Sequence, residues 1–205
     1  MKDRRIGLIL FDGAEELDFV GPFEVFTMIN AVAKGVGIDS KVDVVLVSET
    51  GADIKGAKGM RIGIDYSFEN CPPLDVICIP GGFATRDEIN NPAIIEWIQK
   101  TAPKCEWVTS VCTGAFLLAK AGLTEGKKLT THWFAFDEFK EIGLPGQLQP
   151  QTRYVRDGNL VTAAGVSAGI DMALWLSGQM YNPDLARRVQ KAMEYDPAPP
   201  YSANV

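Results

Sequence analysis

The sequence of 205 residues has a single histidine, His132, and four cysteines with no C-x-x-C pair among them. One histidine and these cysteines do not make up the ligand pattern of a standard structural zinc site. A chain of this length, 46% hydrophobic, buries a sizeable core without the help of disulfide bonds. We therefore predict no bound metal and expect reduced cysteines, as in a cytoplasmic protein.

An excess of positive charge is also missing. The 20 Lys and Arg residues stand against 26 Asp and Glu residues, and the basic residues are scattered, so nucleic acid is not an expected partner. Near the N-terminus, basic residues precede an apolar run of only six residues. This run is too short for the apolar part of a signal peptide or for a membrane span. These absences predict a cytoplasmic protein without a membrane partner.

Apolar runs that alternate with helically spaced segments make up most of the chain. The apolar runs predict strands at 4–11, 41–50, 60–68, 74–82 and 106–111. The spaced segments predict helices at 14–34 (interrupted near Gly21-Pro22), 91–104, 113–122, 134–143, 167–180 and 182–195. A hairpin is expected within 152–165, around Asp157-Gly158. This order predicts one α/β domain spanning 1–205, with a mainly parallel central sheet and helices on both faces.

The segment 106–122, EWVTSVCTGAFLLAKAG, places Cys112 where a buried strand turns directly into a helix. Gly114 lets that helix pack closely, as in the nucleophile elbow of hydrolases. The free N–H groups and the dipole of the helix favour an anion, so we expect a depressed pKa for the thiol. The alternative is that the cysteine is only a small buried hydrophobic residue, and we interpret Cys78 and Cys105 in this way. Cys112 differs because it lies beyond the end of the predicted strand.

A second turn of interest follows the strand at 74–82, which ends in Gly81 and Gly82. In mainly parallel sheets, ligands bind beyond the carboxyl ends of the strands. The glycine turn and Cys112 should both surface at that edge. We therefore expect a small-molecule site there.

Segments spread over nearly the whole chain resemble the ThiJ/PfpI superfamily of cysteine-dependent flavodoxin-like proteins. They are DVICIPGG, VTSVCTGAFLLAKAGL, TTHW, VRDGNLVTAAGVSAGIDMAL and EYDPAPPY. Within the superfamily they resemble the isonitrile hydratase branch, and similar segments occur in the amidase-like sensor domains of AraC-type transcription regulators. The resemblance implies a flavodoxin-like sandwich with a nucleophile elbow and a reaction that requires no metal, nucleotide or flavin.

The resemblance also implies roles for individual residues. It makes Cys112 the nucleophile and Asp18, in EELDFVGP, the acid that meets the thiol from the first helix. Aspartate at this position favours the hydratase branch, since many relatives have glutamate. The backbone amides of Gly81 and Gly82 are implied to face the reacting atom. Thr113 stands where the protease-like branch has histidine, which argues against a Cys-His protease.

The pKa of Asp18 should be raised if this pairing exists. A carboxylate and a thiolate in a partly desolvated pocket are two like charges, so the carboxyl would hold its proton at neutral pH. The alternative reading is that Asp18 merely faces water one turn before a proline.

Three further residues are candidates for the pocket. His132 lies 20 positions after Cys112, an offset that resembles the distant histidine found near the cysteine in several relatives. Alternatively, it is a hydrogen-bonded structural histidine at a strand end. Phe83 and Val166 are candidates to line an apolar slot, with packing in the absence of a ligand as the alternative.

The activity implied by the resemblance is hydration of an isonitrile. The Cys112 thiolate adds to the terminal carbon while Asp18 delivers a proton, and ionised Asp18 then activates the water that releases an N-substituted formamide. Thr113 and the glycine turn stabilise developing charge. Since relatives are commonly homodimers, we expect a homodimer that acts on a small molecule.

Three other functions would use the same thiol or the same fold. Glyoxalase- or deglycase-like relatives, which act on α-oxoaldehydes, usually carry glutamate at the position of Asp18 and often histidine after the cysteine. A redox sensor or stress-protective protein needs only an oxidisable thiol. A ligand-sensing domain of the AraC type would be followed by a helix-turn-helix module, and none is found up to Val205, so a regulator is not expected.

Overall fold

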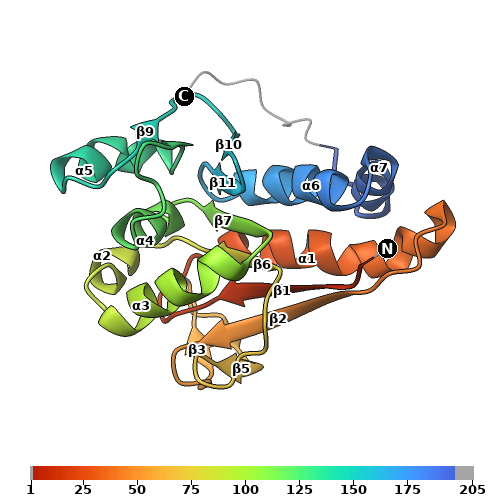
Figure 1. Ribbon diagram of the computed structural model, residues 1–205, viewed down its shortest axis with the longest axis horizontal. Helices are drawn as coiled ribbons and strands as arrows, with labels where there is room; N and C mark the ends of the chain where they lie inside the picture. The colour runs from red at the N-terminus through yellow and green to blue at the C-terminus, as the bar shows by residue number, and fades with distance from the viewer. Residues whose placement is uncertain (1, 197–205) are drawn as a thin grey trace.

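The computed structural model describes residues 2–196 and has a seven-stranded sheet at its centre (Figure 1). Its strand order is β10-β11-β7-β6-β1-β2-β5. The strands are β1 Arg4–Ile9, β2 Val42–Ser48, β5 Tyr66–Ser67, β6 Val76–Ile79, β7 Trp107–Val111, β10 Tyr154–Asp157 and β11 Leu160–Ala163. All neighbours are parallel except β10 and β11. The predicted mainly parallel sheet is confirmed.

Two small sheets lie outside this one. β3 (Ile54–Lys55) pairs with β4 (Arg61–Ile62) in antiparallel orientation, and β8 (Lys128–Leu129) pairs with β9 (Gln147–Leu148) in parallel. The β3–β4 pair carries the loop that reaches the start of the first helix, where the Gly13 N–H donates to the Lys55 carbonyl.

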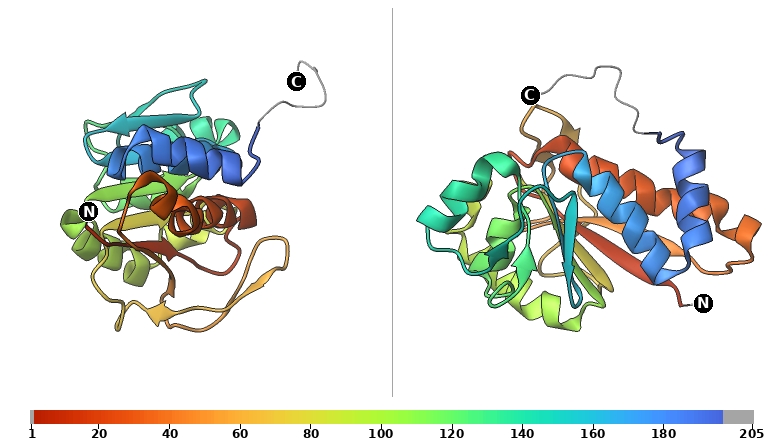
Figure 2. Two further views of the ribbon diagram at one scale, coloured as in Figure 1. Left: turned by 90° about the vertical axis from the view of Figure 1, so that its right-hand side faces the viewer. Right: turned by 90° about the horizontal axis from the view of Figure 1, so that it is seen from above.

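Helices cover both faces of the central sheet, as predicted (Figure 2). One face carries α1 Glu16–Val32, α6 Ala168–Met180 and α7 Pro183–Ala192. The other carries α3 Pro92–Thr101 and α4 Gly114–Lys120, with α2 Thr85–Glu88 and α5 Phe136–Glu141 beside α4. Single 3-10 turns are η1 Ala33–Val36, η2 Ala102–Lys104 and η3 Trp133–Ala135. Side chains of Asn91 and Asn182 cap α3 and α7 by accepting backbone N–H bonds, which confirms the predicted helix starts.

The predicted interruption of the first helix at Pro22 is wrong, because α1 runs unbroken through it. Proline removes one backbone donor from the helix, but tight packing on α6 holds α1 in place. Gly21 and Gly169 permit this approach, since a Cβ atom added at Gly21 would lie 2.8 Å from Cγ1 of Ile170 and one at Gly169 would lie 3.2 Å from Cγ of Pro22.

The single strand predicted at 60–68 is also wrong. The segment divides into β4 and β5, which belong to different sheets. Between them, the Asp65 carboxylate accepts the Leu46 N–H at 2.8 Å while the Asp65 N–H donates to the Leu46 carbonyl at 2.9 Å. A side chain thus takes the place of a backbone acceptor, and regular pairing begins again only at β5. By contrast, the hairpin predicted around Asp157-Gly158 is confirmed by the pairing of β10 with β11.

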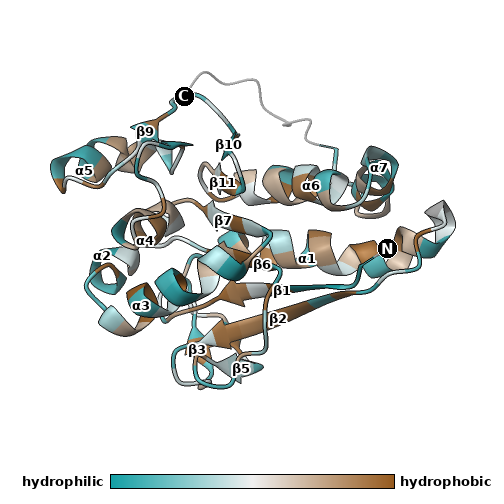
Figure 3. Cartoon of the chain, viewed as in Figure 1, coloured by the Kyte–Doolittle hydropathy of each residue, from teal (hydrophilic) through white to brown (hydrophobic). Residues whose placement is uncertain are grey.

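The core lies on both sides of the sheet. Phe26, Ile29 and Leu176 are buried between the sheet and the α1–α6 layer, while Ile98 and Leu117 are buried on the opposite side. Figure 3 shows the apolar colouring along the strands and on α4, with polar colouring on the outward turns of α3 and α5. Cys78 and Cys105 are buried in this core, as expected for small apolar residues.

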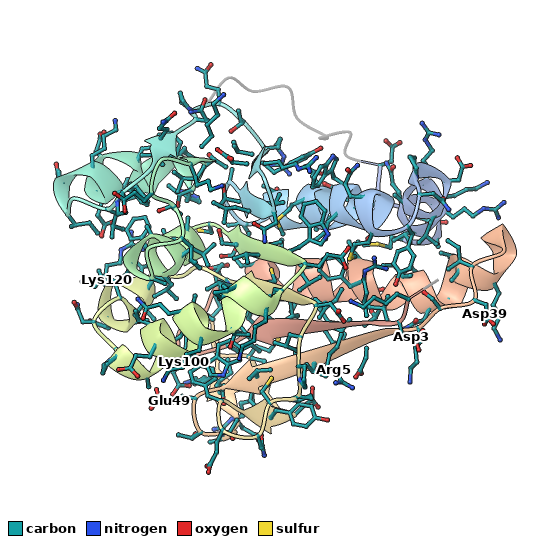
Figure 4. The ribbon with its side chains drawn as sticks, in the orientation of Figure 1. Asp3, Arg5, Asp39, Glu49, Lys100 and Lys120 are labelled. Atoms are coloured by element: carbon teal, nitrogen blue, oxygen red, sulfur yellow. The ribbon has the colours of Figure 1, made fainter. Side chains whose placement is uncertain are left out.

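Charged side chains are spread over the outside of the molecule. Figure 4 labels six of them, of both signs and from separate parts of the surface: Asp3, Arg5, Asp39, Glu49, Lys100 and Lys120. No helix within residues 2–196 is long and apolar enough to cross a membrane.

Replacing Phe26 with Ala should destabilise the fold. Its side chain is 0% exposed, and deleting a buried phenyl ring costs about 3–5 kcal/mol because a cavity remains. Urea unfolding measures the loss. The matched control is Phe83→Ala, where the ring is 80% exposed and the expected loss is below about 1 kcal/mol. Equal losses in the two variants would contradict the placement of the core.

Candidate active site

The three central strands β7, β6 and β1 are neighbours in the sheet, so their carboxyl ends meet at one edge. The segments that follow them carry Cys112 after β7, Gly81 after β6 and Asp18 after β1. Residues from three distant parts of the sequence therefore come together at this edge, where α/β sheets bind ligands.

Cys112 occupies a sharp turn between β7 and α4 and has a φ of 56°, in the left-handed region. The surrounding chain holds this conformation: the Cys112 N–H donates to the carbonyls of Ala163 (3.1 Å) and Ala164 (2.9 Å), and its carbonyl accepts the Thr131 hydroxyl (2.8 Å). The side chain is 7% exposed. The turn therefore fixes a nearly buried thiol at the edge of the sheet.

Glycine is required on both sides of this thiol. A Cβ atom added at Gly114 would lie 2.1 Å from the Ile79 carbonyl oxygen, so only glycine lets α4 start this close to β6. One added at Gly81 would lie 2.5 Å from the Thr113 nitrogen and 2.8 Å from Cβ of Cys112. Both glycines shape the site by allowing backbone to approach closely.

Asp18 lies in the first turn of α1 and is 0% exposed, so it does not face water. Its Oδ2 atom accepts the Gly81 N–H at 2.8 Å. Its Oδ1 atom is buried and accepts no regular hydrogen bond within residues 2–196, although the Cys112 thiol lies close enough to favour the charged form. Burial raises the pKa of the carboxyl to about 7, against the lowering effect of the Gly81 N–H. The predicted rise of the Asp18 pKa agrees with the structure.

The expected depressed pKa of Cys112 is wrong. Burial, and next the charge of Asp18, raise the pKa of this thiol to about 12. Hydrogen bonds from Thr113 and from the Val166 N–H favour the thiolate but are outweighed. The helix that follows has only seven residues, and its end effect does not compensate for removing the sulfur from water beside a carboxylate.

Val166 contributes to the site through its backbone. Its φ is 48°, an uncommon conformation for a β-branched residue, and its N–H is directed at the Cys112 sulfur. From the sequence, Val166 was predicted only to line an apolar pocket with its side chain. The amide contribution could not be read from the sequence, because the side chain gives no sign of a left-handed backbone.

The amides of Gly81 and Gly82 are engaged within the protein. The Gly81 N–H bonds to Asp18, and the Gly82 N–H donates to Oγ1 of Thr113 at 3.1 Å. The Thr113 hydroxyl also accepts from Thr85 (3.0 Å), a contact that no sequence pattern indicated. The glycine turn therefore orients Asp18 and Thr113, and the facing of its amides toward a reacting atom stays a prediction.

A cavity of about 120 Å³ opens above Cys112. It is lined mainly by apolar atoms and includes the predicted residues Phe83, His132 and Val166. The full lining is Glu15, Gly82, Phe83, Arg86, Cys112, Thr113, His132, Phe134, Ala135 and Val166. Phe83 and Phe134 form an exposed aromatic rim, being 80% and 68% exposed. The sequence did not indicate Glu15, Arg86, Phe134 or Ala135, which come from separate segments without a common motif.

His132 combines the two readings that the sequence left open. Its Nδ1 atom accepts the Phe134 N–H at 3.2 Å and so caps η3, while its ring lines the cavity. Burial, and next the charge of Arg86, lower the pKa of the imidazole, so the ring is neutral at pH 7. A Cβ atom added at Gly165 would lie 2.1 Å from Cδ2 of His132, which shows how closely the backbone packs on the ring.

Arg86 brings a positive charge to the cavity, but that charge is paired. Its guanidinium makes a two-pronged ion pair with Glu138, with Nε 2.8 Å from Oε1. It also lies over the rings of Phe83 and Phe116, 5.4 and 5.3 Å from their centroids.

Within residues 2–196, no three His, Cys, Asp or Glu side chains cluster as a metal ion would require.

The chain is similar to several known proteins. The sequence is 37% identical to isonitrile hydratase of Pseudomonas putida over 199 residues, which are 97% of this chain and 82% of that protein. It is 31% identical over 146 residues to the HTH-type transcriptional regulator CdhR of Pseudomonas aeruginosa, covering 71% of this chain and 43% of the regulator. A ThiJ/PfpI family protein from Pseudomonas syringae superposes with a TM-score of 0.85 at 29% identity, covering 100% of this chain and 80% of the other.

The sequence model of the DJ-1/PfpI family matches residues 4–179, a range that holds every candidate site residue described above. This match and the superposed fold confirm the predicted superfamily and the flavodoxin-like α/β architecture. The chain belongs to the DJ-1/PfpI family.

Proposed function

We propose that this protein hydrates an isonitrile to an N-substituted formamide through a covalent bond to Cys112. One observation carries the proposal: the Cys112 thiol and a buried Asp18 carboxyl with a pKa of about 7 meet beneath an apolar cavity. The 37% identity to an isonitrile hydratase over nearly the whole chain supports this chemistry.

The first step forms a carbon–sulfur bond. Asp18 and Cys112 act as one titrating pair, which loses its first proton near neutral pH and its second only at a much higher pH. In the reactive form of the singly protonated pair, Asp18 holds the proton and Cys112 is a thiolate. The sulfur attacks the terminal isonitrile carbon while Asp18 gives its proton to the same carbon, and a thioimidate results.

The second step releases the product. Water adds across the carbon–nitrogen double bond, and the tetrahedral adduct collapses as the carbon–oxygen double bond forms and the carbon–sulfur bond breaks. The hydroxyl group loses its proton as Cys112 leaves as a thiolate, and Asp18 regains a proton, so the starting pair is restored. The N–H groups of Thr113 and Val166, which favour the thiolate, support the sulfur as it leaves. These steps call for no cofactor.

The cavity suits an uncharged, apolar substrate. Phe83, Phe134 and Val166 offer apolar surface to the substituent on nitrogen, and the charge of Arg86 is already paired with Glu138. The single domain over 1–205, the nucleophile elbow, the homodimer and the cytoplasmic location stay predictions.

Substituting Cys112 with Ala should abolish turnover of p-nitrophenyl isocyanide, because no thiolate remains to form the adduct. Asp18→Asn should lower kcat at pH 7 by about 10²-fold or more, since proton transfer by a positioned side chain contributes this much. Absorbance follows the reaction. Cys71→Ala, which changes a half-buried cysteine away from the cavity, is the matched control and should keep full activity. A folded, reduced protein without turnover would overturn the proposal.

The activity should rise with pH through about 7 and then stay level. Below this pH both members of the pair are protonated, and above it the pair has lost the one proton needed to form the thiolate. A kcat/KM profile between pH 5 and 9 measures this rise. In Asp18→Asn the midpoint of the rise should move to higher pH. A profile that falls above pH 7, or one unchanged in the variant, would contradict the role of Asp18.

A further inference from the structure

Asp18 does not reach the wall of the cavity. It is 0% exposed, and the surface above Cys112 is formed by other side chains. Asp18 can exchange a proton with an atom bonded to the sulfur, because it adjoins the thiol. Water that attacks the covalent intermediate must enter from the open side. The sequence-based mechanism, in which Asp18 activates that water, therefore leaves the water without a base on its own side.

Among residues 2–196, three ionisable side chains besides Cys112 line the cavity: Glu15, Arg86 and His132. Arg86 is a permanent cation and is paired with Glu138. In His132, Nδ1 accepts the Phe134 N–H, so the proton of the neutral ring lies on Nε2 and this atom can only donate. Glu15 is the one base among these three groups.

Glu15 is held firmly at the cavity wall. Its N–H donates to the Gly81 carbonyl at 2.9 Å, so its backbone is fixed to the turn that also binds Asp18. Its carboxylate forms an ion pair with Lys58 from the β3–β4 loop. That loop is fixed in turn, because the Lys58 N–H donates to Oε1 of Glu16 at 2.7 Å. The backbone bond to Gly81, rather than the ion pair, keeps Glu15 at the cavity wall, because the Lys58 side chain is 68% exposed and an exposed ion pair contributes little.

We propose that the Glu15 carboxylate holds the water that attacks the thioimidate on Cys112, an inference that rests on the proposed function. The water oxygen bonds to the thioimidate carbon while one water proton passes to Glu15 and from there to the imine nitrogen. The resulting adduct carries N–H and O–H groups and keeps its bond to sulfur. The hydroxyl proton then passes to Glu15 as the carbon–sulfur bond breaks, and Glu15 releases it to water, from which the Cys112–Asp18 pair regains its proton. Protons and electron pairs balance, and Glu15 ends ionised.

Separating the two half-reactions tests this assignment. Glu15→Gln should form the covalent adduct within about threefold of the normal rate, whereas hydrolysis of the adduct should slow by about 10²-fold. Rapid mixing with p-nitrophenyl isocyanide, acid quenching and mass measurement follow both steps, since the adduct adds the mass of one isonitrile. The variant should therefore accumulate adduct, and Glu15→Asp, which keeps a carboxylate, should recover part of the hydrolysis rate.

Lys58→Gln is the matched control, because it removes the same ion pair but leaves the carboxylate at the cavity. Its adduct should hydrolyse within about threefold of the normal rate. Equal slowing in Glu15→Gln and Lys58→Gln would overturn the assignment in favour of a structural ion pair. Equal loss of both half-reactions in Glu15→Gln, or no loss, would also overturn it. If the unmodified protein forms neither adduct nor product, the proposed function itself fails, and this result is distinct from the others.

Discussion

The hydrogen bond from the Gly81 N–H to the buried carboxyl of Asp18 is the contact on which the rest of the site depends. It joins the first turn of α1 to the turn after β6, two segments that are 63 residues apart. A carboxyl that is 0% exposed would be costly to ionise without such a partner. With this bond and the Cys112 thiol beside it, the group titrates near neutral pH. Burial raises the pKa of the carboxyl, and the retained Gly81 donor limits the rise.

The thiol itself depends on backbone conformations that the fold holds in place. Cys112 and Val166 both have positive φ values, and such residues typically cost about 1–3 kcal/mol each. Hydrogen bonds from Cys112 to Ala163 and Ala164 keep the first conformation in place. The second directs an N–H at the sulfur. The sheet and its helices therefore stabilise two strained backbone conformations, which position the thiol and its hydrogen-bond donors.

Two carboxyl groups one helical turn apart have different surroundings. Asp18 faces the interior and the sulfur, whereas Glu15 faces the cavity and Lys58. The sequence presents them as similar acids within AEELDFVG. Their environments make Asp18 a buried carboxyl beside the sulfur and Glu15 a carboxylate at the cavity wall, paired with an exposed lysine. In sites with two carboxyl groups, environment sets the role of each.

The sequence by itself determined the order of the longer strands and helices, the capped starts of α3 and α7 and the position of Cys112 after a strand, because periodicity, caps and turns are local properties. Only the tertiary structure decided that α1 passes unbroken through Pro22, that the Cys112 thiol has a raised pKa and that the amides of Gly81 and Gly82 bond to Asp18 and Thr113. Each of these depends on burial and on neighbours from distant segments. Local pattern predicts what a segment forms, and packing decides what surrounds it.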